Sequence, residues 1–316
     1  MLFRFGNTDL YVSRLCQGTA FRHLPREEDD TSERVLRHAL DVGVNFFDTA
    51  VAYGWGGAER LLGKVVAGRR DRVVICSKIP AMYPPDGPDA KPAPAVFTPT
   101  YLAEQLDASL RRLRTDYLDL LFLHQPDTVT PVLELADRMA TLVRSGKVRY
   151  WGVSNFPASE VATLLETCAE GFAGTEDYYT IAGAELDDQG RSLPRLLEDE
   201  LFPLIRQHGF GLVAFSPMDT GYLVPGRVVE SGSPLADLIS AIDAVAQELG
   251  VTRAQVCVAW VLSHPEVSCV LAGSESPAHV EENLAGTRLA LPEHAVMRLT
   301  EASRRFRAEI ERRAAT

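Results

Sequence analysis

The stretch Val44-Asn45-Phe46-Phe47-Asp48-Thr49-Ala50-Val51-Ala52-Tyr53 decides the fold of this chain. It begins as a buried apolar strand that ends in an acid, and a phenol follows in the next loop. Two other apolar runs end in the same manner, since Lys78 follows residues 73–77 and His124 follows residues 118–123. The C-terminal ends of the strands converge on one face of a parallel barrel, where its chemistry takes place. The sequence therefore predicts an enzyme with a proton-transfer site.

Short apolar runs alternate with longer amphipathic segments along the rest of the chain. The predicted strands lie near residues 15–19, 44–48, 73–77, 117–123, 148–153, 178–182, 211–215 and 267–271. The predicted helices lie near residues 32–42, 58–67, 100–113, 131–145, 158–169, 194–208 and 235–263, the last one split at Gly250-Val251-Thr252. Eight such units in 316 residues favour a closed (β/α)8 TIM barrel over an open sheet. The missing GxGxxG after the first strand also weakens a Rossmann fold.

Three segments lie outside this alternation within a single predicted domain, 1–316. Residues 1–13 alternate around Gly6-Asn7 and predict an N-terminal β-hairpin that plugs the bottom of the barrel. Residues 80–99 contain seven prolines, so we expect an irregular rim or lid of the site there. Residues 292–313 predict a C-terminal helix, which either covers the rim or packs outside.

The amino-acid composition and net charge of the chain indicate which kind of molecule it binds. The chain is 46% apolar and 24% charged, as is typical of globular proteins. Its net charge of −11 and dispersed basic residues argue against nucleic acid and membrane surfaces as partners and leave a small molecule. No run reaches transmembrane length. Five cysteines without CxxC spacing indicate reduced thiols, and we expect a cytoplasmic protein, a monomer or a small homo-oligomer.

The four polar side chains at the strand ends have complementary chemistry. Asp48 and Lys78 follow buried runs, so pairing them is the least costly arrangement, although a simple rim salt bridge is an alternative. An unperturbed tyrosine has a pKa of about 10, and a neighbouring ammonium is expected to lower it. Tyr53 beside Lys78 therefore predicts a general acid. His124 is then placed to hydrogen-bond the oxygen of the substrate.

At this point the chain resembles the aldo-keto reductase superfamily. The matching segments are Asn45-Phe46-Phe47-Asp48-Thr49-Ala50, Tyr53-Gly54, Glu59, Leu62-Gly63, Ser77-Lys78, Ser109-Leu110-Arg111-Arg112-Leu113, Thr115-Asp116-Tyr117-Leu118-Asp119-Leu120, His124-Gln125-Pro126-Asp127, Gly146-Lys147-Val148-Arg149, Gly152-Val153-Ser154-Asn155-Phe156 and Phe215-Ser216-Pro217-Met218. The resemblance implies a barrel that reduces carbonyls with a nicotinamide cofactor and no metal. It also implies a catalytic tetrad, namely Asp48, Tyr53, Lys78 and His124.

The same resemblance implies where the cofactor binds. Ser154 and Asn155 would hydrogen-bond the carboxamide, and Phe215 would stack on the nicotinamide ring. The other implied cofactor contacts are Gly18, Thr19 and Asp48 at the strand ends, Ser216, Pro217 and Met218 over the pyrophosphate, and Gly273, Ser274, His279, Glu282 and Asn283 around the adenosine half.

Two departures from the family pattern concern the cofactor. Many members place a Lys and an Arg around the 2′-phosphate of NADP, where this chain has Gly273 and His279, with Glu275 nearby. Branches with Gly here still use NADPH, so NADP (NADPH) stays slightly favoured and NAD stays possible. The family also has a carboxamide-binding Gln after the sixth strand, with an aromatic three residues later. Here Gly183 takes that position, unless the alignment slips and Gln189 does.

Substrate contacts are the least specific part of this sequence. Four aromatic residues on loops at the top of the barrel are candidates, with ordinary rim packing as the alternative: Phe21, Trp55, Tyr83 and Tyr222. The favoured activity is NAD(P)H-dependent reduction of an aldehyde, ketone or keto-sugar to the alcohol, with Tyr53 as general acid. The alternatives are a cofactor-binding redox sensor or accessory subunit with little turnover, and an isomerase or lyase without hydride transfer.

Overall fold

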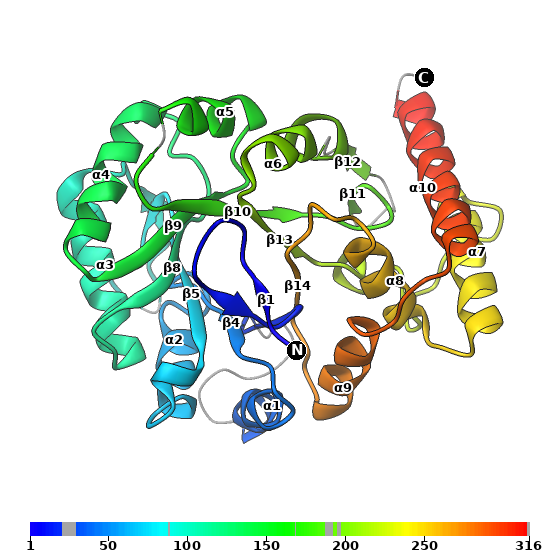
Figure 1. Ribbon diagram of the computed structural model, residues 1–316, viewed down its shortest axis with the longest axis horizontal. Helices are drawn as coiled ribbons and strands as arrows, with labels where there is room; N and C mark the ends of the chain where they lie inside the picture. The colour runs from blue at the N-terminus through cyan, green and yellow to red at the C-terminus, as the bar shows by residue number, and fades with distance from the viewer. Residues whose placement is uncertain (21–29, 88, 168, 187–191, 195–196, 315–316) are drawn as a thin grey trace.

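Eight parallel strands close into a barrel in the computed structural model, which describes residues 1–20, 30–87, 89–167, 169–186, 192–194 and 197–314 (Figure 1). The strands of the barrel are β3 (Leu15–Gly18), β4 (Phe46–Asp48), β5 (Val74–Ile79), β8 (Leu118–Leu123), β9 (Val148–Ser154), β10 (Phe172–Tyr178), β13 (Gly211–Phe215) and β14 (Cys269–Ala272). Strand β14 pairs with β3 and completes the ring. The predicted (β/α)8 TIM barrel is confirmed.

Helices surround the barrel on its outer side (Figure 1). They are α1 (Asp30–Asp41), α2 (Gly57–Val65), α3 (Pro99–Leu113), α4 (Val132–Arg144), α5 (Ala158–Glu166), α6 (Phe202–His208), α7 (Pro234–Leu249), α8 (Arg253–Leu262), α9 (Pro277–Gly286) and α10 (Glu293–Ala314). Gly250 ends α7 at φ 66°, and Thr252 begins α8 with a capping box. The predicted break in the long helical segment is therefore confirmed.

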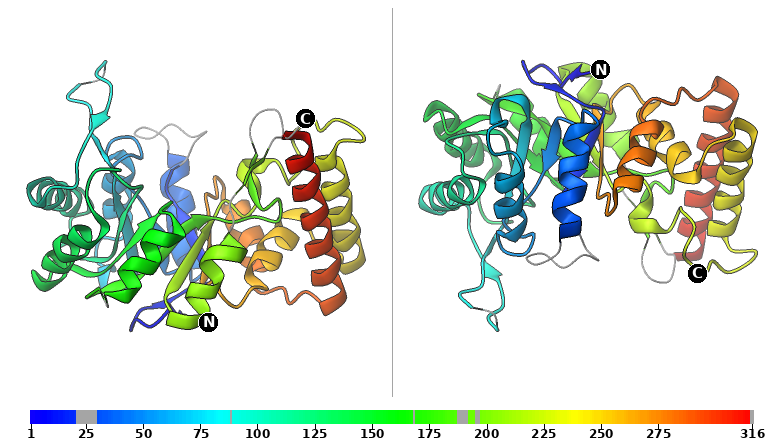
Figure 2. Two further views of the ribbon diagram at one scale, coloured as in Figure 1. Left: turned by 90° about the horizontal axis from the view of Figure 1, so that it is seen from above. Right: turned by 90° about the horizontal axis from the view of Figure 1, so that it is seen from below.

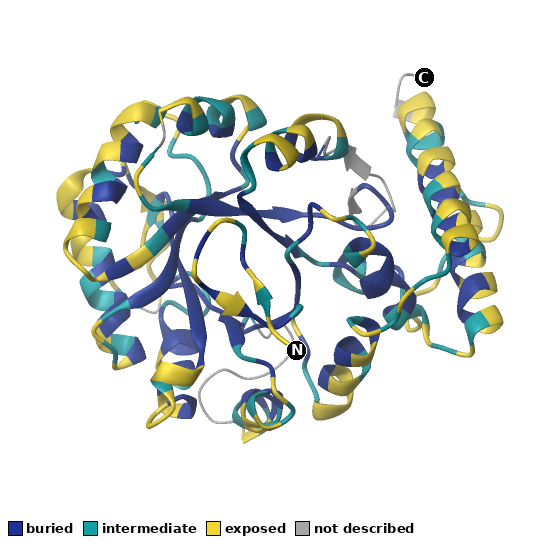
Figure 3. Cartoon of the chain, in the orientation of Figure 1, coloured by how far each residue is buried: buried dark blue, intermediate teal, exposed yellow. Residues whose placement is uncertain are grey.

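Burial follows the layers of the barrel (Figure 3). The strands are buried, and the surrounding helices bury one face and expose the other, as amphipathic helices do. Between strands and helices lies the larger apolar core, and a second apolar cluster fills the inside of the barrel. In the part of the chain that the structure describes, no helix has both the length and the apolar character needed to cross a bilayer.

The N-terminal hairpin closes one end of the barrel. Strands β1 (Phe3–Arg4) and β2 (Tyr11–Val12) pair, and the turn between them carries Phe5 into the apolar cluster inside the barrel. Phe5 is fully buried and meets the ring of Phe46 edge-on at 6.1 Å. A side chain on Gly211 would begin 2.5 Å from the Phe5 ring, so the glycine makes room for this plug. The predicted plug is confirmed.

The segment of residues 80–99 contains more regular structure than its prolines predicted. Strands β6 (Met82–Tyr83) and β7 (Ala93–Pro94) form a two-stranded ribbon. Figure 2 shows this ribbon projecting from the end of the barrel opposite the N-terminal hairpin. Two-residue strands tolerate proline because little of their backbone needs a partner. Helix α10 packs against α7 outside the barrel, which settles the two options for the C-terminal helix.

Two predicted boundaries are wrong, and both follow β9. The strand predicted at 178–182 is β10, which begins six residues earlier, at Phe172. Its sequence Phe-Ala-Gly-Thr-Glu-Asp-Tyr is polar for a buried strand, because several of its side chains belong to the site. The helix predicted at 194–208 is shorter and corresponds to α6. It is preceded by β12 (Ser192–Pro194) and a π turn (Leu197–Leu201), and β12 pairs with β11 (Ala184–Leu186).

The plug at the bottom of the barrel leads to a stability prediction. Phe5→Ala removes a fully buried ring and leaves a cavity, so we expect a loss of about 3–5 kcal/mol in the free energy of unfolding. Tyr11→Ala, in the same hairpin but 57% exposed, should change it by less than about 0.5 kcal/mol. Urea denaturation followed by circular dichroism measures both. Equal, small losses in the two variants would show that the hairpin only lies on the surface.

Candidate active site

The predicted catalytic side chains meet at the end of the barrel opposite the hairpin. Side chains alternate along a strand, and residues 46, 76 and 122 point into the barrel as part of its inner apolar cluster. Two residues after each of these inward positions come Asp48, Lys78 and His124, so their side chains point inward too. Asp48 and Lys78 lie on their strands, and His124 lies directly after the end of β8. Tyr53 reaches the same place from the loop after β4.

Lys78 lies at the centre of this group. Its ammonium nitrogen forms an ion pair with Asp48 and lies 3.2 Å from the phenol oxygen of Tyr53. The ring of Tyr53 meets the imidazole of His124 edge-on, with the ring centres 5.9 Å apart. The structure therefore brings together all four residues of the predicted tetrad.

A fifth polar side chain, Glu176, belongs to this group and was missed in the sequence. It lies on β10, is 2% exposed, and places Oε1 at 3.1 Å from the ammonium of Lys78. Because the sixth strand was predicted too late in the chain, Glu176 fell outside it. Tyr179 follows three residues later, so Glu176 occupies the position at which the family pattern has Gln.

Gly183 does not occupy that position, which corrects the prediction. It lies five residues beyond the end of β10, and a side chain there would meet Arg307 of α10 at 2.3 Å. The alternative, Gln189, lies outside the described residues. The alternation of side chains along a strand that starts at Phe172 is the signal that identifies Glu176.

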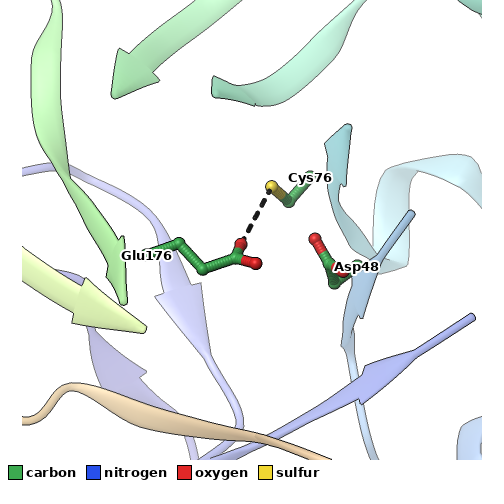
Figure 4. Close-up of side chains that lie close together, drawn as sticks. All are labelled: Asp48, Cys76 and Glu176. Atoms are coloured by element: carbon green, nitrogen blue, oxygen red, sulfur yellow. Dashed lines mark hydrogen bonds between the residues drawn. The ribbon is translucent and has the colours of Figure 1, made fainter. Parts of the chain in front are cut away.

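Three potential metal ligands lie close together in this group (Figure 4). Asp48 and Glu176 face each other with Cys76 beside them, all buried, and the thiol of Cys76 contacts the Glu176 carboxylate at 4.0 Å. The ammonium of Lys78 already contacts both carboxylates, so a divalent cation here would be repelled by a neighbouring positive charge. The arrangement suits a lysine held by two acids better than a metal.

Burial dominates the electrostatics of the two acids. It raises the pKa of Asp48 above its ordinary value, although the Lys78 ammonium acts in the opposite direction. It also raises the pKa of Glu176 to about 8, with a further increase from the neighbouring charge of Asp48. Lys78 loses hydration by burial, but the two carboxylates outweigh this and raise its pKa well above the usual range. The lysine is therefore a permanent cation.

Tyr53 and His124 are both uncharged near neutral pH. Burial raises the pKa of Tyr53, and the Lys78 ammonium offsets only part of this increase. The predicted net decrease is therefore wrong for the free protein, because two nearby carboxylates and burial outweigh one ammonium. Burial, together with Lys78, lowers the pKa of His124 to about 3. Both side chains are thus protic, neutral hydrogen-bond donors at pH 7.

A cavity of about 1310 Å³ opens from this group. This volume exceeds the range of roughly 300–1,000 Å³ typical of ligand pockets, so the cavity has room for a large ligand and a small one together. It runs from Asp48, Tyr53 and His124 at the barrel mouth to the junction of α7 and α8 and the first turns of α9. The cavity thus connects the predicted catalytic group with the segment predicted to hold adenosine.

The mouth of the cavity provides polar groups suited to a carboxamide. Ser154 and Asn155 line it, and the amide nitrogen of Asn155 donates to the hydroxyl of Ser154 at 2.9 Å. Asn155 adopts φ 59°, a left-handed conformation that Asn tolerates better than most residues. Gly18 lines the same region, and the buried hydroxyl of Thr19 has no hydrogen-bond partner within the described chain.

Phe215 and the loop after it form one wall of the cavity. Phe215 meets the ring of Tyr178 edge-on at 5.3 Å, which fixes its orientation. Ser216, Pro217 and Met218 follow it along the wall. The hydroxyl of Tyr178 donates to the buried carboxylate of Asp219 at 2.5 Å and so anchors this loop to β10.

The far end of the cavity contains the residues predicted around adenosine. Gly273 leaves open space where a side chain would begin, so its backbone faces the cavity. The side chain of Asn283 donates to the hydroxyl of Ser274 at 3.1 Å. The charged or titratable residues that line this end are Arg227, Asp243, Arg253, Glu275, His279 and Glu282. Arg253 is held by Asp243 through two bonds of 2.5 and 2.8 Å.

The predicted substrate residues divide into two groups. Tyr222 lines the cavity and is 8% exposed. Trp55 and Tyr83 are not among its lining residues, and Tyr83 of the projecting ribbon packs edge-on against Tyr101 of α3 at 4.9 Å. Ala52 and Tyr53, from the same loop as Trp55, do line the cavity, so substrate contact by Trp55 and Tyr83 stays a prediction. Phe21 lies outside the described residues.

Comparisons with known proteins agree with this geometry. The model of the Aldo/keto reductase family matches residues 14–304. An uncharacterized oxidoreductase of Bacillus subtilis, YrpG, is 33% identical over 311 residues, with 90% of each chain covered. A probable voltage-gated potassium channel subunit beta of Arabidopsis thaliana is 30% identical over 304 residues, with 88% of each chain covered.

A solved structure shares the fold. The holo form of an aldo-keto reductase from Bacillus halodurans superimposes with a TM-score of 0.78 at 24% identity, over 95% of each chain. The match of the family model over residues 14–304 and the relative at 33% identity show that the chain belongs to the aldo-keto reductase family.

Proposed function

We propose that this protein is a nicotinamide-dependent oxidoreductase that reduces the carbonyl of an aldehyde, ketone or keto-sugar to an alcohol. One observation supports the proposal above all: Lys78 binds Asp48 and Tyr53 at the mouth of a cavity that suits a dinucleotide. A buried lysine that touches a phenol is costly to maintain, and a reacting site explains its presence. We further propose that the protein acts in the cytoplasm.

The chain's own residues handle the proton of this reaction. Tyr53 donates its phenolic proton to the oxygen of the substrate, and the ammonium of Lys78, 3.2 Å away, stabilises the phenolate that remains. Neutral His124 donates a hydrogen bond to the same oxygen and orients the carbonyl. Asp48 holds the lysine in place. The cofactor, when bound, supplies the hydride, and the same groups serve the reverse reaction.

The proposed cofactor contacts follow the walls of the cavity. Ser154 and Asn155 hold the carboxamide, Phe215 stacks on the ring, and residues 216–218 cover the pyrophosphate. The adenosine half lies along residues 273–283. We keep NADPH slightly ahead of NADH, because Arg253 supplies a cation at this end of the cavity, where the usual Lys and Arg are missing.

An accessory role is the second candidate function. The Arabidopsis relative is named as a probable channel subunit beta, so a barrel of this family need not act alone. The complete tetrad favours an enzyme over such a subunit. A stoichiometric partner that co-purifies with a protein lacking turnover on any carbonyl would favour the subunit.

Tyr53→Phe tests the role of the phenol. Without the transferable proton we expect kcat to fall by about 10²–10⁴-fold, with an unchanged dissociation constant for the cofactor. Steady-state kinetics on a panel of aldehydes, ketones and keto-sugars measures the loss, and calorimetry measures cofactor binding. Tyr11→Phe, at an exposed position, is the control. Turnover that survives in the Tyr53 variant would refute the assigned proton donor.

Arg253→Met tests the proposed contact with the 2′-phosphate. Losing a charge-assisted hydrogen bond should weaken NADPH binding by about tenfold and leave NADH binding nearly unchanged. Parallel calorimetric titrations with the two cofactors measure this difference. Arg37→Met on the outer face of α1 should change neither. Tighter binding of NADH than of NADPH to the unmodified protein would reverse the proposed preference.

His124 should stay neutral throughout the working range of pH. Its pKa of about 3 lies well below 5, so protonation of His124 contributes no loss of activity between pH 8 and pH 5. The same decrease in pKa means that stability falls as the pH drops from about 6.5 towards 3, since the unfolded chain then binds the proton more readily. Nitrogen NMR of labelled histidine, assigned with His124→Gln, measures the charge state. An imidazolium signal at pH 5 would contradict this.

A further inference from the structure

Glu176 is a buried acid for which the proposed proton transfer has no use. It lines the cavity at the barrel mouth and is 2% exposed. On β10 it lies level with Ser154 of β9 and Val213 of β13, two residues before Phe215. It therefore lies between the proposed carboxamide contacts and the proposed stacking ring, beside the place proposed for the nicotinamide.

The charge of this residue distinguishes the site from one with the usual glutamine. Gln is neutral, so Asp48 and Lys78 alone would form a pair without net charge. Glu176 adds a second carboxylate to the same ammonium, at 3.1 Å from it. The thiols of Cys16, Cys76 and Cys269 are neutral, because burial raises the pKa of each one. With both acids ionised, the site has one uncompensated negative charge.

We propose that Glu176 makes the nicotinamide end of the cavity select the oxidised cofactor over the reduced one. The proposal rests on the proposed nicotinamide-dependent function. The oxidised nicotinamide ring has a positive charge and the reduced ring has none, so an adjacent carboxylate attracts only the first. In a buried site with little water this attraction is strong. A glutamine of the same shape offers the hydrogen bond without the charge.

Preferential binding of the oxidised cofactor determines which substrate the enzyme–cofactor complex can convert first. Alcohol and oxidised cofactor interconvert with carbonyl, reduced cofactor and one proton, so two electrons and a hydrogen nucleus leave the carbinol carbon together. A protein that takes up the oxidised form from a mixed pool can start only from an alcohol. Where Glu176 is ionised, an alcohol is therefore the substrate that the loaded enzyme meets first.

Glu176→Gln tests the proposal through binding alone. Calorimetric titration at pH 9 with NADP⁺ and NADPH, and with NAD⁺ and NADH, gives the ratio of the two dissociation constants within each pair. In the variant we expect this ratio, oxidised over reduced, to rise by about tenfold or more, through weaker binding of the oxidised form. Asp243→Asn removes the same charge from the α7–α8 end of the cavity and should leave the ratio unchanged.

The unmodified protein provides a second measurement that needs no variant. Glu176, with its pKa of about 8, is mostly protonated at pH 6, so the preference for the oxidised form should be weaker at pH 6 than at pH 9. The titratable groups around it are Asp48 on β4, Tyr53 after β4, Cys76 and Lys78 on β5, His124 after β8, Cys16 on β3 and Cys269 on β14.

The outcomes separate this proposal from the proposed function. A ratio that changes by less than about twofold in Glu176→Gln, with both forms still bound, overturns the role of Glu176 and leaves the oxidoreductase intact. A ratio in the unmodified protein that is the same at pH 6 and pH 9 overturns it equally, even if the variant fails to fold. Failure of the unmodified protein to bind any of the four nucleotides overturns the nicotinamide assignment itself.

Discussion

The rest of the site depends on one buried ammonium. Lys78 is 1% exposed, and an uncompensated charge at that depth would be too costly to keep. Asp48 on β4 and Glu176 on β10 hold it from two sides of the barrel, and the pair with Glu176 connects β5 with β10, two strands that are not neighbours. The lysine then contributes its remaining hydrogen-bonding capacity to Tyr53. The ammonium of Lys78 therefore affects both the positions and the pKa values of the acids and the phenol at the mouth of the barrel.

The two-residue period of the strands places these groups at the same height. Phe46, Cys76, Phe122 and Val213 fill the interior with apolar side chains, and the next inward position on each strand, or just beyond it, is polar or aromatic and belongs to the site. Gly152 contributes to this layering, because a side chain there would begin 2.3 Å from the Phe122 ring. Apolar packing below thus fixes the polar layer above.

Much of this arrangement could be predicted from the sequence, because most strands are short apolar runs that end in one polar residue. That pattern predicted the barrel and the group of polar side chains at its mouth, and the alternation of residues 1–13 around Gly6-Asn7 predicted the hairpin plug. It failed at β10, whose inward positions are Gly174 and Glu176 instead of apolar residues. The direction of the Tyr53 pKa was also wrong, because the sequence did not show how deeply the phenol is buried or that a second acid adjoins it. Loops such as those of Trp55 and Tyr83 have no periodicity to orient them.

The plug formed by Phe5 has a consequence for how protons reach the buried acids. With Phe5 and the inner apolar cluster filling the barrel below, water reaches Asp48 and Glu176 through the cavity mouth. A ligand that fills this mouth therefore displaces the water that hydrates both acids, and the plug at the other end offers no second route for water to return.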